Sequence, residues 1–303
     1  MYNLKLHLQD KDWLYTSKGL SRGFIQPEKL NELWFHTGTN CNLSCPFCFE
    51  RSMPGDKRIN SLSYDLAKSY IDQALELGVS KFCFTGGEPF ANKDIIKILD
   101  YALRYCPCLV LTNGTDPLIN KMDEVLSLKN SPNELSFRIS LDSVVETEHD
   151  KNRGIGNFKK VVNTILFLDI KGFSISIASI TQSGSNYAEK RKKQFKIFFE
   201  ENGISNDIPI TIFPDLNQNS DTEITESCMK KYYSAEKQNS FMCSNIKMLA
   251  VKDNMQQVYP CTLVDDDPDY NLGDDLFQAM KYKIILKHKR CMACFANGVS
   301  CSG

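Results

Sequence analysis

Short apolar runs alternate with longer stretches of helical periodicity from about residue 33 to residue 214. The apolar runs are rich in β-branched and aromatic residues and predict six strands, at 33–39, 81–87, 109–115, 135–143, 173–181 and 207–215. The stretches between them predict amphipathic helices over 64–78, 93–105, 116–128, 156–172 and 188–203. Six strand–helix units predict an α/β fold whose parallel sheet, joined by right-handed crossovers, is open or closed into a partial barrel.

The carboxyl ends of the predicted strands carry polar or glycine-rich sequences. After the first four strands they are GTNCNLSC, TGGEP, TNGT and SLDS. Ligands of parallel α/β folds bind at the carboxyl ends of the strands, which share one rim. The pattern therefore predicts one site that is assembled from several loops.

The alternation stops after residue 215. Residues 214–227 are polar and rich in turn formers, which is typical of a linker. Beyond them we expect short strands, a hairpin turn at 252–254, a short helix over 274–287 and a cysteine-rich end. We therefore divide the chain into a lead-in (1–32), the α/β barrel (33–215) and a small α+β module (216–303) stapled by metal rather than by a large core.

Composition narrows the function. The 303 residues carry a formal net charge of −1, which argues against a nucleic-acid partner. The basic run at 189–196 has helical spacing and is interpreted as a solvated helix face. The N-terminus does not resemble a signal peptide and no stretch is apolar enough to span a membrane, so we expect a cytoplasmic protein. Its 12 cysteines are then expected to be unpaired.

Three of these cysteines lie within eight positions, in CNLSCPFC. Cys41, Cys45 and Cys48 have a spacing that would align them on one face of a helix. Asn42 and Pro46 are poorly suited to a helix interior, so a loop that wraps a ligand is the better interpretation. By contrast, Cys83, Cys106 and Cys108, in a strand or at a helix end, are expected to be small buried apolar residues.

Several chemistries use closely spaced thiols. A structural zinc site takes four ligands, and His36 and Glu50 are the nearby candidates for the fourth. Residues 45–48 also form a C-x-x-C of the thioredoxin type, but with an extra cysteine in front. An iron–sulfur cluster held by three thiolates keeps one iron open for a substrate.

The spacing C-x3-C-x2-C resembles the signature of the radical S-adenosylmethionine (SAM) superfamily. The sequences TGGEP, TNG and SLDS, and the arginine of HDKNRG at 149–154, match that family's pattern in order and spacing. The resemblance implies a (β/α)6 partial TIM barrel in which the three thiols hold a [4Fe–4S] cluster whose open iron binds SAM. It also implies a set of SAM-binding residues around the cluster: Phe47, Gly86, Gly87, Glu88, Asn113, Ser140, Asp142 and Arg153.

The resemblance gives these residues roles. Phe47 would pack near the adenine, and Glu88 and its neighbouring backbone would hold the methionine amino group. Ser140 and Asp142 would face the ribose or the carboxylate. Arg153 would hold the SAM carboxylate, for which a bidentate guanidinium is suited.

The tail resembles the SPASM/Twitch extension of radical SAM enzymes. VYPC, LGD and CMAC match that extension, which implies an auxiliary [4Fe–4S] cluster with these candidate ligands: Cys243, Cys261, Cys291, Cys294 and Cys301. The usual hairpin glycine is replaced by Asp253 and Asn254, which tolerate the left-handed geometry. The full SPASM pattern continues past the point where this sequence ends, so we expect either a one-cluster Twitch version or a shortened chain. Cys228 is an outside candidate, and a zinc site built from the first four thiols is the alternative.

The resemblance implies reductive cleavage of SAM to a 5′-deoxyadenosyl radical that removes a hydrogen atom from a substrate C–H bond. The electron would come from a flavodoxin- or ferredoxin-type donor. The expected substrate is a peptide or protein that is oxidised or cross-linked. The alternatives are a Twitch-type dehydrogenase of a small molecule and, from another class, a non-catalytic zinc- or iron–sulfur-binding protein. No residue is identified as a general base.

Overall fold

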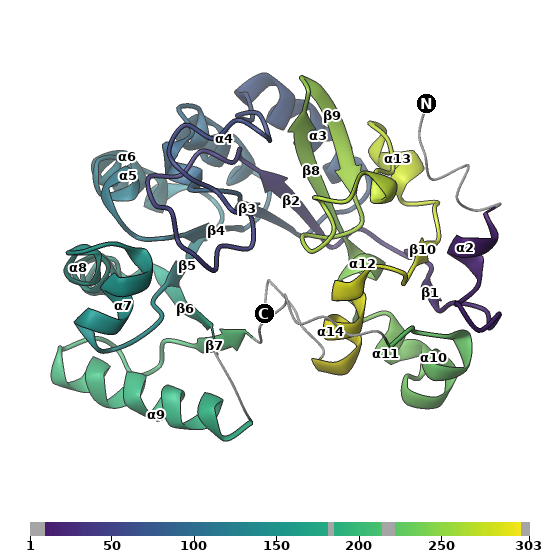
Figure 1. Cartoon of the computed structure of the whole chain (residues 1–303). Coiled ribbons are helices and arrows are strands. Elements are labelled where there is room, and N and C mark those ends of the chain that lie inside the picture. The colour runs from purple at the N-terminus through teal and green to yellow at the C-terminus, as the bar shows by residue number, and fades with distance from the viewer. Residues whose placement is uncertain (1–9, 181–184, 214–221, 298–303) are drawn as a thin grey trace.

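The computed structural model describes residues 10–180, 185–213 and 222–297. Its main sheet has the strand order β7-β6-β5-β4-β3-β2-β8-β9, and the strands from β2 to β7 are parallel. The predicted (β/α)6 partial barrel is thus confirmed (Figure 1). The six parallel strands are β2 Glu32–His36, β3 Lys81–Thr85, β4 Cys108–Thr112, β5 Leu135–Ser140, β6 Ser174–Ile180 and β7 Ile210–Phe213. Each ends slightly before its predicted bound, which leaves most of the motif residues in the loops, whereas Ser140 is the last residue of β5.

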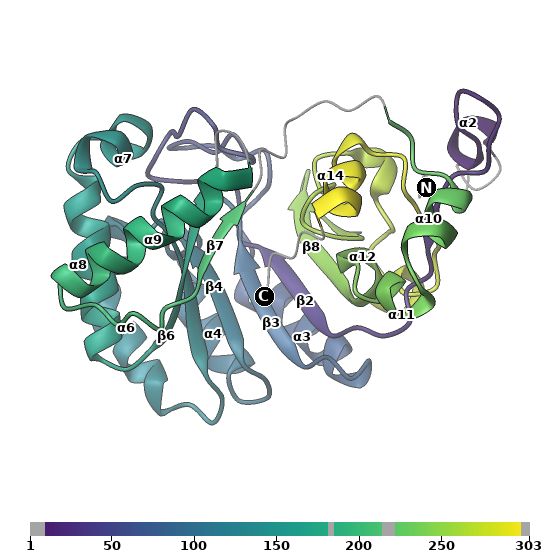
Figure 2. The ribbon, with the colours of Figure 1, turned by 90° about the horizontal axis from the view of Figure 1, so that it is seen from below.

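The crossover helices lie on the outside of the curved sheet, as Figures 1 and 2 show. One helix was expected over 116–128, but the structure has two short helices there, separated at Asn120 and Lys121. The backbone of Lys121 leaves the helical region, with φ −105° and ψ 12°. The helices of this part are α3 Tyr64–Glu76, α4 Ile95–Ala102, α5 Asp116–Ile119, α6 Met122–Ser127, α7 Glu146–Arg153, α8 Asn157–Ile170 and α9 Ser185–Glu201.

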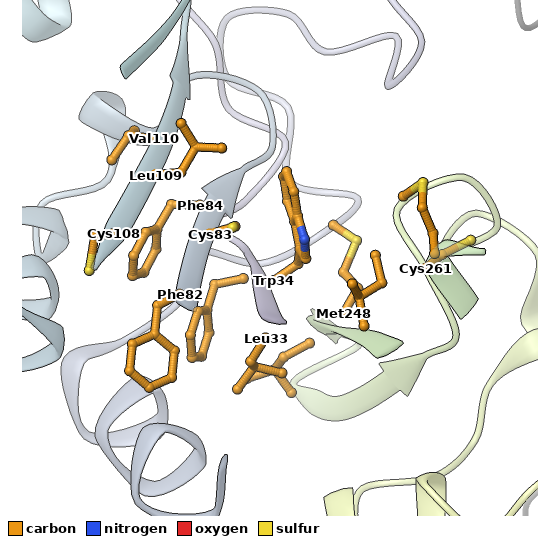
Figure 3. Close-up of a cluster of buried hydrophobic side chains, with 14 of the residues drawn as sticks. Leu33, Trp34, Phe82, Cys83, Phe84, Cys108, Leu109, Val110, Met248 and Cys261 are labelled. Atoms are coloured by element: carbon orange, nitrogen blue, oxygen red, sulfur yellow. The ribbon is translucent and has the colours of Figure 1, made fainter. Parts of the chain in front are cut away.

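The core of the barrel is built from strand residues that interlock between neighbours. Trp34 pairs in register with Cys83, and Cys83 pairs with Leu109 (Figure 3). Cys83 and Cys108 are fully buried, and burial raises the pKa of both thiols. The interpretation of these cysteines as small apolar core residues is confirmed, and it holds for Cys106 as well, which is also buried.

The C-terminal part continues the sheet. Strand β8 (Ile246–Lys252) pairs in parallel with β2, and β9 (Met255–Tyr259) pairs antiparallel with β8. The turn between them is the predicted hairpin, in which Asp253 and Asn254 have φ values of 51° and 59°. This part also has short helices, of which α12 contacts β8, and Figure 2 shows them on the same side of the molecule as β8: α10 Glu226–Tyr232, α11 Ala235–Gln238, α12 Met242–Asn245 and α14 Lys289–Asn297.

The prediction of one helix over 274–287 is wrong. Only α13 (Leu276–Ala279) is helical, and β10 (Ile284–Ile285) pairs antiparallel with β1 (Phe24–Ile25). The two isoleucines favour a strand, and a distant partner strand overrides the helical spacing. The segment around β1, which includes α2 (Lys11–Leu14), also contacts the C-terminal part through an ion pair of 2.6 Å between Arg22 and Glu223.

Two further expectations concern the whole chain. The 11 cysteines in the described ranges are all free thiols, as predicted, and Cys301 lies outside those ranges. None of the helices in the described part is both long and apolar enough to cross a membrane.

Candidate active site

A cavity of about 740 Å³ opens at the carboxyl ends of the parallel strands. Each of the six strands, from β2 to β7, contributes to its wall. Its volume lies in the range of small-molecule sites. All of the residues predicted for the SAM site except Glu88 line it, namely Cys41, Cys45, Phe47, Cys48, Gly86, Gly87, Asn113, Ser140, Asp142 and Arg153.

The three thiols lie on a loop, as the sequence predicted. No residue between β2 and α3 is helical. The N–H of Cys41 donates to the carbonyl of Met53 at 3.3 Å, and the N–H of Cys48 donates to the carbonyl of Cys45 at 3.0 Å. The amide of Asn42 donates to Thr115 Oγ1 at 2.9 Å, which ties the loop to the end of β4.

The environment of these thiols fits an iron–sulfur cluster. Burial raises the pKa of Cys41 to about 11. Burial also raises the pKa of Cys45, although the guanidinium of Arg153 opposes the shift. Thiols with raised pKa values become thiolates only when a cation compensates the charge, and cluster iron does so. Cys45 and Cys48 are half-buried and face the cavity, so a ligand can reach a metal that they hold.

Glu88 does not line the cavity. Its carboxylate is 1% exposed and accepts hydrogen bonds from Thr112 Oγ1 at 2.8 Å, the N–H of Asn113 at 2.8 Å and the N–H of Phe90 at 3.1 Å. Burial raises its pKa to about 7 although these donors oppose the shift. In this structure Glu88 therefore joins the end of β3 to the end of β4.

The two glycines before Glu88 let two loops approach closely. A Cβ atom on Gly87 would lie 2.4 Å from the carbonyl oxygen of Asn40, and one on Gly86 would lie 2.7 Å from that of Gly38. The N–H of Gly87 donates to Gly38 O at 2.8 Å. Side chains at either position would push the thiol loop away from β3.

Asp142 and Arg153 form a bidentate ion pair at the cavity wall. Arg153 Nε lies 2.6 Å from Asp142 Oδ2, and Nη2 lies 3.2 Å from Oδ1. The guanidinium also lies over the ring of Phe47, 5.4 Å from its centroid. His149 Nδ1 accepts the N–H of Asp142 at 3.3 Å and so helps to position the pair. Three residues predicted to contact SAM are thus brought together, with Arg153 between the other two.

His36, Glu50 and Asp265 form a second polar cluster, with ligand atoms within 4.8 Å of one another. The Nδ1 of His36 accepts the N–H of Gly38 at 3.2 Å, so the proton of the neutral imidazole lies on Nε2, which faces Glu50 Oε2 at 3.3 Å. Neither ring nitrogen then has a lone pair for a metal. This arrangement argues against His36 as the fourth ligand of a zinc site with the loop thiols.

Helix α9 supplies cavity residues that the sequence analysis missed. Tyr187 and Arg191 line the cavity, and Arg191 Nη1 donates to Ser143 Oγ at 3.0 Å. The basic run at 189–196 was interpreted as a solvated face, which is wrong for Arg191, whose side chain is 11% exposed. The helical spacing gave no sign that one basic residue faces inward.

Four thiols of the C-terminal part line a second cavity of about 20 Å³. Cys243 lies on α12, Cys261 follows β9, and Cys291 and Cys294 are one turn apart on α14. Burial raises the pKa of Cys291 to about 12, with the neighbouring Cys294 adding to the shift. Cys243 and Cys261 are buried and Cys291 and Cys294 are half-buried, and four thiols that line one cavity fit a metal–thiolate centre.

The other two cysteine candidates of this part are not among these thiols. Cys228 lies on α10 and does not line the second cavity; the hydroxyl and N–H contacts that it makes with Thr225 lower the pKa of its thiol. Cys301 lies outside the described residues. Leu263 lines both cavities and separates them.

The family model described as "Radical SAM superfamily" matches residues 35–192, which is just over half of the chain. The chain belongs to the radical SAM superfamily. The match contains the three loop thiols and every residue of the predicted SAM-binding set. It implies the SAM-bound [4Fe–4S] cluster, and the loop thiols described above fit that group.

Two curated relatives share part of this sequence. The subtilosin biosynthesis protein AlbA of Bacillus subtilis is 30% identical over 185 residues, which cover 58% of this chain and 40% of AlbA. The mycofactocin maturase MftC of Mycobacterium tuberculosis is 28% identical over 150 residues, which cover 49% of this chain and 37% of MftC. The matches therefore span less than half of the length of either relative.

A solved structure shows the same fold. SuiB of Streptococcus suis bound to SAM superposes with a TM-score of 0.63 at 14% identity, over 84% of this chain and 66% of SuiB. SuiB bound to its precursor peptide SuiA gives a TM-score of 0.50 at 18% identity, over 70% of this chain and 41% of SuiB. Both agree with the partial barrel.

Proposed function

We propose that this protein is a radical SAM enzyme that oxidises or cross-links a peptide. One observation carries the proposal: the three loop thiols and all but one of the predicted SAM-binding residues line a single cavity. When bound there, a reduced [4Fe–4S] cluster and SAM supply reductive cleavage of SAM to methionine and a 5′-deoxyadenosyl radical, which takes a hydrogen atom from the substrate. A flavodoxin- or ferredoxin-type protein would donate the electron.

The residues of the cavity orient the reactants and exclude water. Cys41, Cys45 and Cys48 would hold the cluster. Arg153 is preorganised by Asp142 and Phe47, so its charge is fixed where the SAM carboxylate would bind. Rigid walls of this kind lower the entropy cost of bringing reacting groups together.

The C-terminal part would hold an auxiliary [4Fe–4S] cluster of the SPASM/Twitch kind. Its ligands would be Cys243, Cys261, Cys291 and Cys294, which line one cavity. Four thiolates leave no open iron, so such a centre can accept an electron but cannot bind a substrate. Leu263 lines both this cavity and the larger one, so the two proposed clusters would lie on either side of a shared wall residue.

The peptide substrate is supported by the relatives. AlbA and MftC are named for the biosynthesis of a bacteriocin and the maturation of mycofactocin, and SuiB has been solved with a precursor peptide. The space beyond Arg153, bounded by Lys151, Tyr187 and Arg191, is where a substrate side chain would enter.

The test is anaerobic reconstitution with iron and sulfide, followed by reduction in the presence of SAM. We expect about eight iron atoms per chain and release of 5′-deoxyadenosine. A variant with alanine at Cys41, Cys45 and Cys48 should lose SAM cleavage and keep about four iron atoms. A colourless wild-type protein without SAM cleavage would refute the proposal. Incubation with candidate precursor peptides, followed by mass spectrometry for loss of two hydrogen atoms, tests the substrate class.

A further inference from the structure

Lys247 is buried and contacts the backbone of Cys243, one of the four thiol residues. It is on β8 and has an exposed fraction of 0%. Its ammonium donates to the carbonyl of Cys243 at 3.3 Å and to that of Ile246 at 2.8 Å. Burial lowers the pKa of Lys247 to about 8, and the nearby thiols of Cys243 and Cys261 oppose this shift. A buried ammonium is therefore bonded to the backbone of one of the four proposed cluster ligands.

This charge has no carboxylate partner. In the ranges that the structure describes, no carboxylate oxygen lies within ion-pair distance of Lys247 Nζ. Lys252, at the other end of β8, is different, because the carboxyls of Asp265 and Glu50 favour its positive charge. Burial of an ammonium without a counter-charge is strongly unfavourable, so a negative group near Lys247 that is not a carboxylate would stabilise its charge.

Thiolates of a metal centre provide that negative group. Four thiolates carry more negative charge than a [4Fe–4S] core carries positive charge, and each added electron makes the centre more negative. A fixed positive charge nearby therefore favours the reduced centre, since net charge and hydrogen bonding set the potentials of these clusters.

We infer that Lys247 is the counter-charge of the metal–thiolate centre held by Cys243, Cys261, Cys291 and Cys294, and that it raises the reduction potential of this centre. The inference rests on the proposed function in one respect, the presence of the auxiliary cluster. A raised potential makes the centre a better acceptor for an electron that leaves the substrate. Lys247 is thus a positioning residue, since it acts through the cluster and not on the substrate.

The experiment uses the reconstituted protein and the substitution Lys247→Met, which keeps the length of the side chain and removes its charge. Lys252→Met is the matched control, because it is the same substitution on the same strand. The reduction potential of the C-terminal cluster is measured by an anaerobic redox titration followed by electron paramagnetic resonance. In Lys247→Met we expect the equilibrium to shift at least tenfold toward the oxidised cluster, which is about 59 mV for one electron. Lys252→Met should show no such shift.

A second measurement covers a variant that fails to load the cluster. In iron-free protein no cluster lies beside Lys247, so the buried ammonium lacks the proposed counter-charge, and Lys247→Met should raise the thermal midpoint of unfolding. A lysine with only a structural role would give a lower midpoint on substitution. If the variant does not load the cluster, the direction in which the thermal midpoint changes therefore tests the role of Lys247.

The outcomes separate the inference from the proposed function. A wild-type protein whose four thiols bind no iron contradicts the auxiliary cluster itself. A loaded Lys247→Met protein with an unchanged potential overturns the role of Lys247 and leaves the cluster standing. If Lys247→Met binds no cluster and its iron-free form has a lower thermal midpoint than wild type, the inference on Lys247 is also overturned. If it binds no cluster but has a higher midpoint, the inference is supported.

Discussion

The two thiol sites differ in the space that adjoins their thiols. Cys41, Cys45 and Cys48 lie on a loop and line a cavity of about 740 Å³. Cys243, Cys261 and the two half-buried thiols of α14 line a cavity of about 20 Å³. The first site has three thiols and space for a ligand, whereas the second has four thiols and none. The difference is what we expect if the first site exchanges a ligand and the second holds only a metal centre, as proposed above.

The positive charges near the two sites differ as well. We call the site of Cys41, Cys45 and Cys48 the open site, and that of the four C-terminal thiols the closed site. Arg153 faces the open site but is paired with Asp142, so its charge is largely balanced before any ligand binds. Lys247 bonds to the backbone of Cys243, and in the described ranges no carboxylate pairs with it. On the inference above, the site of Cys243, Cys261, Cys291 and Cys294 is electrostatically balanced only when its proposed metal is bound.

Removal of one thiol from the closed site should show whether substrate oxidation depends on this site while SAM cleavage depends on the open site. Cys261→Ala is expected to abolish substrate oxidation, with a loss of at least about 100-fold, because the electron acceptor is absent. Cleavage of SAM by chemically reduced protein should persist, since the loop thiols are unchanged. Product and 5′-deoxyadenosine are measured together by chromatography. Loss of both activities would show that the two sites are not independent.

Disruption of the Arg153–Asp142 pair should cost stability and SAM affinity together. Arg153→Ala leaves the Asp142 carboxylate buried without a partner, which typically costs about 3–5 kcal/mol of unfolding free energy. The double variant Arg153→Ala/Asp142→Ala should recover much of this stability but not the binding of SAM. Denaturant midpoints and equilibrium binding of SAM measure the two effects. If the double variant binds SAM as wild type does, Arg153 has no role in SAM binding.

Glu88 should make the stability of the open site depend on pH. Its pKa in the folded protein is raised to about 7 from an ordinary 4.5, so the stability that it contributes is present below about pH 4.5 and is lost as the pH rises through 7. The shift corresponds to at most about 3 kcal/mol. Glu88→Gln should remove this slope, and at pH 5 it should cost about 1–3 kcal/mol because the N–H of Asn113 loses its acceptor.

Urea midpoints between pH 5 and pH 8 measure the effect of Glu88, and the exposed Glu76 offers the control Glu76→Gln. If Glu88→Gln and Glu76→Gln show equal pH profiles, Glu88 does not titrate in this range.

The sequence was informative about the rim because parallel strands end at a common edge. The order of CNLSC, GGEP, TNG and SLDS after successive strands was enough to place the loop thiols, Asn113 and Asp142 around one cavity. The direction of each side chain could not be predicted in this way. Glu88 bonds to Thr112 and Asn113 because the close approach of the glycine loop to β2 turns it toward β4.

Long-range pairing was the other feature beyond the reach of sequence patterns. The parallel pairing of β8 with β2 and the pairing of β10 with β1 join segments that are more than 200 residues apart. Local spacing contains no information on such partners, and for this reason the helix expected over 274–287 was wrong. Lys247 was missed for the same reason, since its burial depends on the strands and helices that cover β8.

The smallest expected effect tests how the closed site is assembled. The β8–β9 hairpin begins just after Cys243 and ends just before Cys261, so its register sets how the two thiols meet. Asn254 has φ 59° in the turn, a conformation that costs an L-residue about 1 kcal/mol and costs glycine nothing. Asn254→Gly should therefore change the unfolding free energy by no more than about 1 kcal/mol and leave the iron content unchanged. Asn254→Val, with a β-branched side chain at positive φ, should cost about 1–3 kcal/mol and lower the iron content of the closed site. Equal iron content in the two variants would show that helices α12 and α14, rather than the turn, determine where the thiols meet.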